Sequence, residues 1–218
     1  YGKTLRSRIE KTYEIYMELF LQFGSHEFVK SYAMNVKSVI EKCFPKTIAN
    51  EIKGISDGSG IDIWKIYAIN ARTEIVCDLG SMTDECTAVI YRKGNIMAQN
   101  WDWIDCMQDQ IVLVRFILSD INEYKNDDYK TDAILSLIEP GMIGKIGLNS
   151  DKIGTLLTLL RKPNDYLKEL ELDNVRYSGI PIHFLLRLIL ECNNIDYICN
   201  KLFNSIPINT SSCIGISN

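Results

Sequence analysis

The chain has 218 residues, of which 46% are hydrophobic and 24% are charged, a balance typical of a folded globular domain. Its formal net charge of −4 gives no electrostatic basis for binding nucleic acid, because proteins that do so carry basic surfaces. No apolar run is long enough to cross a bilayer as a helix. We therefore expect neither a nucleic-acid partner nor a membrane partner.

Cysteine and histidine usage favours free thiols over disulfides or a metal centre. The seven cysteines are odd in number and spread along the chain, and a domain of this size does not need cross-links for stability. The chain has no C-x-x-C motif, and its two histidines, His26 and His183, lie far apart. We therefore expect no metal site and a reducing compartment, the cytoplasm, with the peroxisome left open.

Helical periodicity dominates the first 80 residues. Apolar residues recur at spacings of three and four over residues 4–23, and the same pattern resumes over residues 25–45. A shorter helix is expected at residues 46–57. A fourth helix is expected from Asp62, which would be its N-cap, to about residue 75.

The pattern then changes to short apolar and β-branched runs bounded by turn residues, which are typical of strands. Six such runs predict strands, at residues 86–92, 95–101, 109–118, 133–138, 142–148 and 153–160. Two polar segments are expected to be loops, at residues 119–131 and 161–179. Helices are expected after Pro181 and at 195–205, and a last strand at 211–216. This order of elements predicts a layered α+β domain.

The stretch from Asp84 to Trp103 is predicted to form a hairpin that gathers polar groups at one end. Its two apolar strands flank Lys93-Gly94-Asn95, a sequence typical of a turn. The return strand would bring Asn100 and Asp102 beside Cys86 at the start of the first strand. A thiol, an amide and a carboxylate would thus lie together, which makes Cys86 a candidate nucleophile.

A cysteine nucleophile needs a base, usually a histidine. His26 and His183 both lie among apolar residues of predicted helices, which favours a packing role and makes a histidine-assisted thiol hydrolase the weakest alternative. If the chain is cut before Cys86, the new α-amino group, with a pKa of about 8, could accept the thiol proton. Asp102 would then hold the α-ammonium, and Asn100 would donate to the substrate or the nearby backbone. The structural alternative makes Asp102 a cap between two core tryptophans and Cys86 a buried free thiol.

Five motifs spread over most of the chain carry a family resemblance. They are Asn70-Ala71-Arg72-Thr73-Glu74, Glu85-Cys86-Thr87-Ala88, Gln99-Asn100-Trp101-Asp102, Gly141 to Ser150, and Gly179-Ile180-Pro181-Ile182-His183 with Leu186-Arg187. In this order they resemble the acyl-coenzyme A:6-aminopenicillanic acid acyltransferases, also called the isopenicillin N acyltransferase-like family or C45 peptidases. These enzymes are N-terminal nucleophile (Ntn) hydrolases, so the resemblance implies an autocatalytic acyltransferase or amide hydrolase.

The resemblance implies a precursor that cuts itself between Glu85 and Cys86. Residues 1–85 would become a helical propeptide or small subunit, and residues 86–218 the start of a β-rich catalytic part. The two halves would stay associated as one αββα sandwich. Because family members continue further, we expect this chain to be a fragment whose sandwich is incomplete at both ends.

The resemblance also implies roles for single residues. Cys86 would be the nucleophile of both self-cleavage and acyl transfer, with Asp102 close to its thiol and Asn100 as their neighbour. Arg72 and Glu74 would support the cleavage loop. Substrates would be small amides or thioesters, whose acyl group passes to the thiol and then to water or an amine. No cofactor is expected, and acyl-coenzyme A would enter only as a substrate.

Three departures from the family pattern keep an alternative open. Glu85 stands where the family commonly has glycine, which would hinder the backbone distortion of an N-to-S acyl shift. Asp151-Lys152 stands where small residues are usual, and the chain ends at Asn218, before an asparagine thought to form the oxyanion hole. The alternative is therefore a truncated, catalytically inactive relative that binds a partner or is a remnant.

Overall fold

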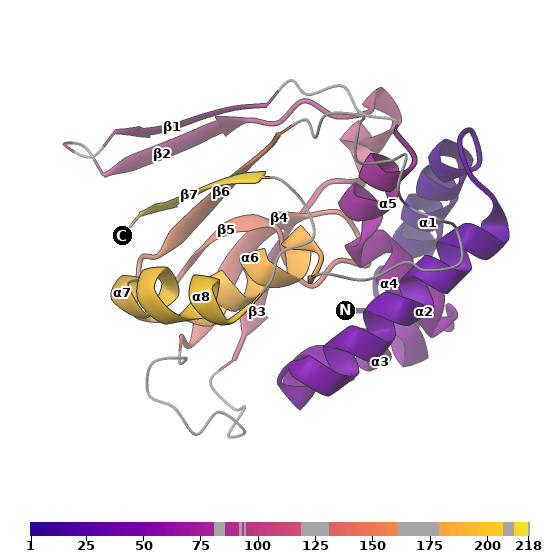
Figure 1. Cartoon of the computed structure of the whole chain (residues 1–218), viewed down its shortest axis with the longest axis horizontal. Helices are drawn as coiled ribbons and strands as arrows, with labels where there is room; N and C mark the ends of the chain where they lie inside the picture. Colours follow the sequence, from indigo (N-terminus) through magenta and orange to yellow (C-terminus); the bar gives the residue numbers. More distant parts are fainter. Residues whose placement is uncertain are drawn as a thin grey trace.

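Helices α1 to α5 gather at one end of an antiparallel sheet in the computed structural model (Figure 1). The structure describes residues 1–80, 86–91, 93, 95–118, 131–160, 179–206 and 212–217. Glu85 and nearly all of the two expected loops at 119–131 and 161–179 lie outside these residues. The described part confirms a mixed α+β fold with antiparallel strands.

Residues 1–80 form five helices, as their periodicity predicts in outline. They are α1 (Arg6–Phe20), α2 (His26–Cys43), α3 (Lys46–Ser59), α4 (Ile63–Asn70) and α5 (Arg72–Asp78). Ser25 begins α2 as an N-cap, because its hydroxyl accepts a hydrogen bond from the Phe28 N–H at 3.1 Å. Gly60 ends α3 with a left-handed φ of 70°, which glycine adopts without strain.

The expected fourth helix is in fact two helices. The backbone leaves helical geometry at Ala71, with φ −107° and ψ 15°, and α5 begins immediately after it. The side chain of Asp62 makes no capping hydrogen bond at the start of α4, contrary to the sequence prediction. Residues 66–76 are buried without interruption. Such a run has no exposed face, so hydrophobic periodicity gives no warning of the break.

In the part of the chain that the structure describes, five strands form one antiparallel sheet in the order β3-β4-β5-β6-β7. Their bounds are β3 (Val112–Ile117), β4 (Ala133–Ile138), β5 (Ile146–Asn149), β6 (Gly154–Leu159) and β7 (Ser212–Ser217). β1 (Thr87–Tyr91) and β2 (Ile96–Asn100) form a separate two-stranded hairpin. The six predicted strands and the last one therefore all exist, divided between two sheets.

Two strands begin later than the sequence predicts. β3 is preceded by a 3-10 helix, η2 (Asp105–Gln110), and β5 is preceded by a loop at residues 139–145. Asn70 holds that loop away from strand geometry. Its amide nitrogen donates to the Gly141 carbonyl at 2.9 Å, and its amide oxygen accepts from the Ile143 N–H at 3.0 Å.

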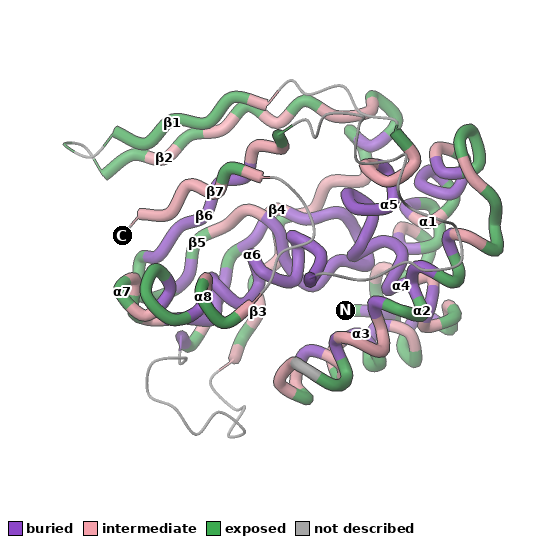
Figure 2. The backbone as a smooth tube through the Cα atoms, viewed as in Figure 1, coloured by how far each residue is buried: buried purple, intermediate pink, exposed green. Residues whose placement is uncertain are grey.

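Helices cover one face of the five-stranded sheet. α6 (Ile182–Glu191) is buried along its whole length and packs against β4, β5 and β6. It is followed by α7 (Ile195–Tyr197), a π-helical turn (Ile198–Leu202) and α8 (Phe203–Ser205). Figure 2 shows the buried backbone concentrated where the sheet meets these helices. No helix in the described part of the chain combines the length and the apolar character needed to cross a membrane.

The hairpin lies over the opposite face of the sheet, where it contacts β6 and β7 (Figure 1). Gln99 fastens it there with a double hydrogen bond to the main chain of β6. The amide oxygen of Gln99 accepts from the Leu157 N–H at 2.9 Å, and its amide nitrogen donates to the Leu157 carbonyl. The outer surface of β1 is exposed, so the hairpin is a thin second layer with little above it.

Gly147 tests how closely β4 and β5 are packed. A Cβ atom at this position would collide with the Leu135 carbonyl oxygen and press on Ser136. We expect Gly147→Ala to lower the free energy of unfolding by about 1–3 kcal/mol, measured by urea titration. Gly54→Ala is the control, because an added Cβ in the exposed face of α3 meets nothing within 4 Å. It should be neutral or stabilising by about 0.5–1 kcal/mol. Equal effects at both sites would contradict the packing.

Candidate active site

Cys86 immediately precedes β1, and the hairpin register places it opposite the end of β2. Thr87 pairs with Asn100, so the thiol and the residues after Asn100 share one end of the hairpin. The Cys86 Sγ lies 3.9 Å from the main-chain oxygen of Asp102, within reach of an S–H donor. The thiol is partly exposed rather than enclosed by hydrocarbon. The predicted gathering of Cys86, Asn100 and Asp102 is therefore present in the structure.

The amide and the carboxylate bind each other. Asn100 Nδ2 donates to Asp102 Oδ2 at 2.9 Å. We expected Asn100 to face a substrate or the backbone near the cut, but its hydrogen bond in this structure goes to the carboxylate. The contact between Cys86 and Asp102 runs through the main chain. Asn100 thus orients the Asp102 carboxylate at the surface.

Two tryptophans connect this end of the hairpin to buried charges. The Trp103 indole N–H donates to the Tyr16 hydroxyl at 2.8 Å, and the Arg72 guanidinium carbon lies 4.8 Å from the Trp103 ring centroid. The Lys145 ammonium nitrogen lies 2.9 Å from the centroid of the Trp101 ring. Both rings therefore face cations, an arrangement that the ring quadrupole favours.

Those cations belong to a buried cluster around Glu139. Arg72 binds the carboxylate with two hydrogen bonds, from Nε at 2.6 Å and from Nη2 at 3.0 Å. Lys145 Nζ donates to Glu139 Oε1 at 3.0 Å. All three side chains are at most 3% exposed. One carboxylate is thus shared by two cations in the interior, and the cluster joins α5 to the loop between β4 and β5.

Burial and mutual charge set the protonation of this cluster. Burial by itself would raise the pKa of Glu139, but Arg72 and Lys145 more than offset it and lower the pKa to about 2. The pKa of Lys145 falls to about 7, chiefly because burial removes its ammonium from water. Glu139 partly restores the charged form of Lys145, while Arg72 opposes it. Lys145 therefore titrates near neutral pH.

Two other residues of the Asn70–Glu74 segment, Thr73 and Glu74, also make buried contacts. Thr73 Oγ1 lies 3.0 Å from His183 Nε2, and Glu74 Oε1 accepts the Ile182 N–H at 2.7 Å at the start of α6. Burial, reinforced by Arg72, lowers the pKa of His183 well below its usual range. His183 is therefore a neutral interior side chain. The loop that Arg72 and Glu74 were expected to support lies outside the described residues.

Sequence reasoning gave no role to Glu139 or Lys145, although both are central to the site. A signal for them exists. Glu139 follows the apolar strand β4 directly, and Lys145 interrupts an apolar, glycine-rich run at residues 140–148. A charged residue at such a position is buried and must find a partner. Among the described residues, no cluster of histidine, cysteine and carboxylate side chains could hold a metal ion.

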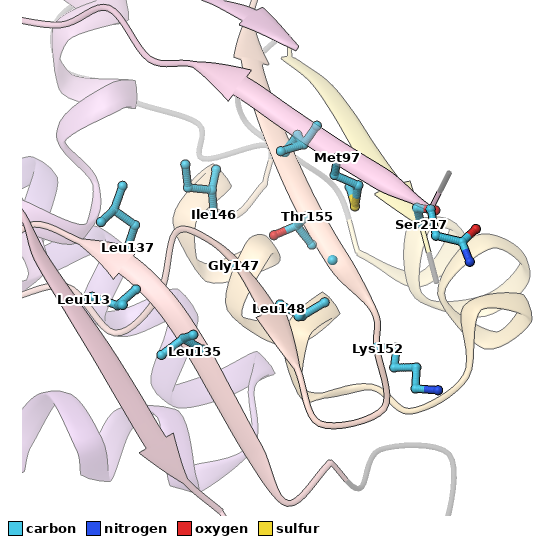
Figure 3. Close-up of a pocket in the computed structure, with 13 residues that line it drawn as sticks. Met97, Leu113, Leu135, Leu137, Ile146, Gly147, Leu148, Lys152, Thr155 and Ser217 are labelled. Carbon is cyan, nitrogen blue, oxygen red and sulfur yellow. The ribbon is translucent and has the colours of Figure 1, made fainter. Parts of the chain in front are cut away.

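A cavity of about 580 Å³ lies between the hairpin and the outer face of the sheet (Figure 3). Its volume is in the range of small-molecule sites. The lining is largely aliphatic, with Met97 above it on β2 and Leu113, Leu135, Leu137, Ile146 and Leu148 below it. Ile146 directly follows Lys145, so this part of the lining adjoins the buried charges. Lys152 and Ser217 also line the cavity and are polar.

The sequence matches no protein-family model. It is 25% identical over 185 residues to the 40 kDa form of acyl-coenzyme A:6-aminopenicillanic-acid-acyltransferase from Emericella nidulans. The chain is a distant homologue of this acyltransferase. The match covers 84% of the chain, which supports the resemblance to the isopenicillin N acyltransferase-like family. It covers 46% of the acyltransferase, so the chain spans about half the length of that homologue.

Glu139→Gln tests the buried cluster through the pH dependence of stability. The folded-state pKa of Glu139 is about 2, below its ordinary value of 4.5, so its ionisation stabilises the fold above pH 4.5. This contribution is lost as the pH falls from 4.5 to 2. At pH 7 the variant should lose about 3–5 kcal/mol, because Arg72 and Lys145 are left without their carboxylate.

The measurement is the free energy of unfolding of both proteins by urea titration across this pH range. The difference between wild type and variant should shrink toward acid pH. Glu14→Gln is the control, since Glu14 belongs to an exposed pair at 3.5 Å and should cost little at any pH. A difference that stays constant from pH 7 to pH 2 would contradict the assignment of charge to Glu139.

Proposed function

We propose that this chain carries the nucleophile of a cysteine-dependent Ntn amidohydrolase or acyltransferase. The observation that carries the proposal is the position of Cys86: a partly exposed thiol just before a strand, 3.9 Å from the main-chain oxygen of Asp102, whose carboxylate is bound by Asn100. If the chain is cut immediately before Cys86, this cysteine becomes the N-terminal residue of a new chain. The distant homology to an acyltransferase supports the same chemistry.

In this proposal the chain first cuts itself between Glu85 and Cys86, and the freed α-amino group becomes the base. Its pKa of about 8 lets it accept the thiol proton near neutral pH. The thiolate attacks the carbonyl carbon of an amide or thioester, and the amine or thiol leaving group takes a proton. The acyl group then passes from Cys86 to water or to an amine. Asp102, held by Asn100, stabilises the α-ammonium.

The layers of the structure support an αββα sandwich as the proposed architecture. Helices cover one face of the five-stranded sheet, and the hairpin lies over the other face as the beginning of a second sheet. Residues 1–85 and 86–218 would be the two chains after the cut. They would stay associated, because the Arg72–Glu139 pair and the Thr73–His183 contact both cross the division.

The cavity supports an apolar acyl group as the preferred part of the substrate. Its aliphatic lining would exclude water around a hydrocarbon chain, and each buried methylene contributes about 0.8 kcal/mol. Among the lining residues that the structure describes, only Lys152 could pair with a charged acyl group, and the aliphatic side chains would not replace the hydration that such a group loses. We therefore propose thioesters or amides of medium to long aliphatic acids as the substrate class.

A second candidate is a non-catalytic relative that binds a partner through the same face of the sheet. The observation in its favour is the exposure of Leu113, Leu135 and Leu148, which are 64%, 43% and 49% exposed. Apolar patches of this kind mark interaction surfaces. Glu85 also favours this candidate, because a glycine at that position would permit the strained backbone of the cut more readily.

Self-cleavage separates the two candidates. The full-length protein should resolve into two chains, the second beginning at Cys86, when its intact mass and its N-termini are determined. Cys86→Ala should remain a single chain, because no thiolate forms. Cys213→Ala is the matched control, since Cys213 is a free, exposed thiol on β7, and it should be cut like the wild type. A wild-type protein that stays uncut favours the non-catalytic candidate.

Substrate class is tested by filling the cavity. Leu148→Trp should lower kcat/KM for octanoyl-coenzyme A about tenfold and leave acetyl-coenzyme A nearly unchanged, because only the longer chain reaches the aliphatic wall. Ile117→Trp is the control, since Ile117 is 57% exposed on β3 and does not line the cavity. Release of free coenzyme A measures both reactions. A loss that is equal for both chain lengths would show that the cavity does not hold the acyl group.

A further inference from the structure

Self-cleavage before Cys86 needs a base that the mature mechanism does not supply. In the uncut chain the nitrogen of Cys86 belongs to a peptide bond, so its lone pair is delocalised and accepts no proton. The α-amino group becomes available only after the cut that it would have to assist. Another group near the thiol must therefore accept the first proton.

Three ionisable side chains that the structure describes near this end of the hairpin are candidates for the group that accepts the thiol proton. The Asp102 carboxylate is hydrogen-bonded to Asn100, and its group in contact with the thiol is the main-chain oxygen. His183 is buried and bound to Thr73, and the charges that act on it come from Arg72 and Lys145. Lys145 is different, because its ammonium nitrogen lies 2.9 Å from the centroid of the Trp101 ring, and Trp101 directly precedes the residue whose main-chain oxygen contacts the thiol. The charges of Lys145 and Cys86 also interact.

The surroundings of Lys145 favour an amine that gives up and accepts protons readily. The side chain is 3% exposed, donates to Glu139 at 3.0 Å and lies against the Trp101 ring, one residue before Asp102. Glu139 is already bound twice by Arg72, so it compensates the Lys145 charge only in part. The charged groups that act on the ammonium are Glu139 from its own loop, Arg72 from α5 and Cys86 before β1.

We propose that Lys145 is the base that accepts the Cys86 thiol proton in the uncut chain and so starts self-cleavage. The neutral amine takes the proton from Sγ, and the thiolate attacks the carbonyl carbon of residue 85. The C–N bond then breaks, and the Cys86 nitrogen leaves with the proton returned by Lys145. The products are a thioester between residue 85 and Sγ and a free α-amine. Water hydrolyses the thioester to a carboxylate and the thiol.

The inference rests on the proposed function only in taking the cut before Cys86 as the step that Lys145 serves. The reactivity of the thiol tests it separately. In uncut protein, tryptic peptide 73–92 contains both Cys77 and Cys86, whereas cut protein yields a peptide that begins at Cys86. Alkylation of each cysteine in the 73–92 peptide by iodoacetamide therefore reports on the uncut chain, with Cys77 as an internal standard.

The full-length protein is treated with iodoacetamide from pH 5.5 to pH 9.5, and the modified peptides are quantified by mass spectrometry. The Cys86 rate should be raised near neutral pH, because the neighbouring Lys145, whose pKa burial lowers to about 7, accepts the thiol proton there. At pH 7 this makes Cys86 about tenfold more reactive than an unassisted thiol. Lys145→Met should remove this tenfold gain at Cys86 and leave the Cys77 rate unchanged. Equal Cys86 rates at pH 7 in the wild type and in folded Lys145→Met would overturn the proposal.

Lys145→Arg distinguishes a base from a fixed positive charge. Arginine keeps the charge at all relevant pH values and accepts no proton, so this variant should fold, by circular dichroism, and remain uncut. If the wild type is already cut when purified, uncut chain should accumulate in both Lys145 variants. Complete cutting of either folded variant would overturn the proposal. Failure of the wild type to cut, with a Cys86 rate at pH 7 that still depends on Lys145, would count against the proposed function and leave the thiol–amine pair standing.

Discussion

The ion pair between Arg72 and Glu139 is the constraint on which the rest of the site depends. It places a guanidinium and a carboxylate in the interior, where an unpaired charge would be far too costly to keep. The pair connects the first turn of α5 with the end of β4, 67 residues further along the chain. Because neither group can move without exposing the other, the helical layer and the sheet have one relative position. Lys145 binds the carboxylate of this pair, and the Trp103 ring packs against its guanidinium.

The hairpin depends on the same interior. Its polar end is held by Trp101 and Trp103, which face Lys145 and Arg72, and its middle is held by Gln99 on the main chain of β6. These attachments leave Cys86 and Asp102 at the edge of the cluster, partly open to solvent. The thiol can thus meet a substrate from outside while a buried amine acts on it from inside. The cavity under the hairpin extends this arrangement with an aliphatic surface.

Much of this architecture could be predicted from local sequence, and the part that could not involves contacts between distant residues. Alternating apolar residues around Lys93-Gly94-Asn95 are sufficient for the hairpin, and its register then brings Asn100 toward Cys86. The break at Ala71 was missed because a wholly buried run has no periodicity to read. The role of Lys145 was missed because a single sequence does not show which carboxylate a distant lysine will meet. Local pattern likewise does not show that the hairpin packs face to face on the larger sheet.

In the proposed reaction, Cys86 carries the acyl group as a covalent thioester. Its most direct test is the mass of the peptide that carries Cys86 after brief incubation of the full-length protein with octanoyl-coenzyme A and acid quenching. We expect one octanoyl group on that peptide, removed by hydroxylamine as a thioester would be. Octanoylation confined to Cys106, Cys199 or Cys213, or absent altogether from a folded protein, would contradict it.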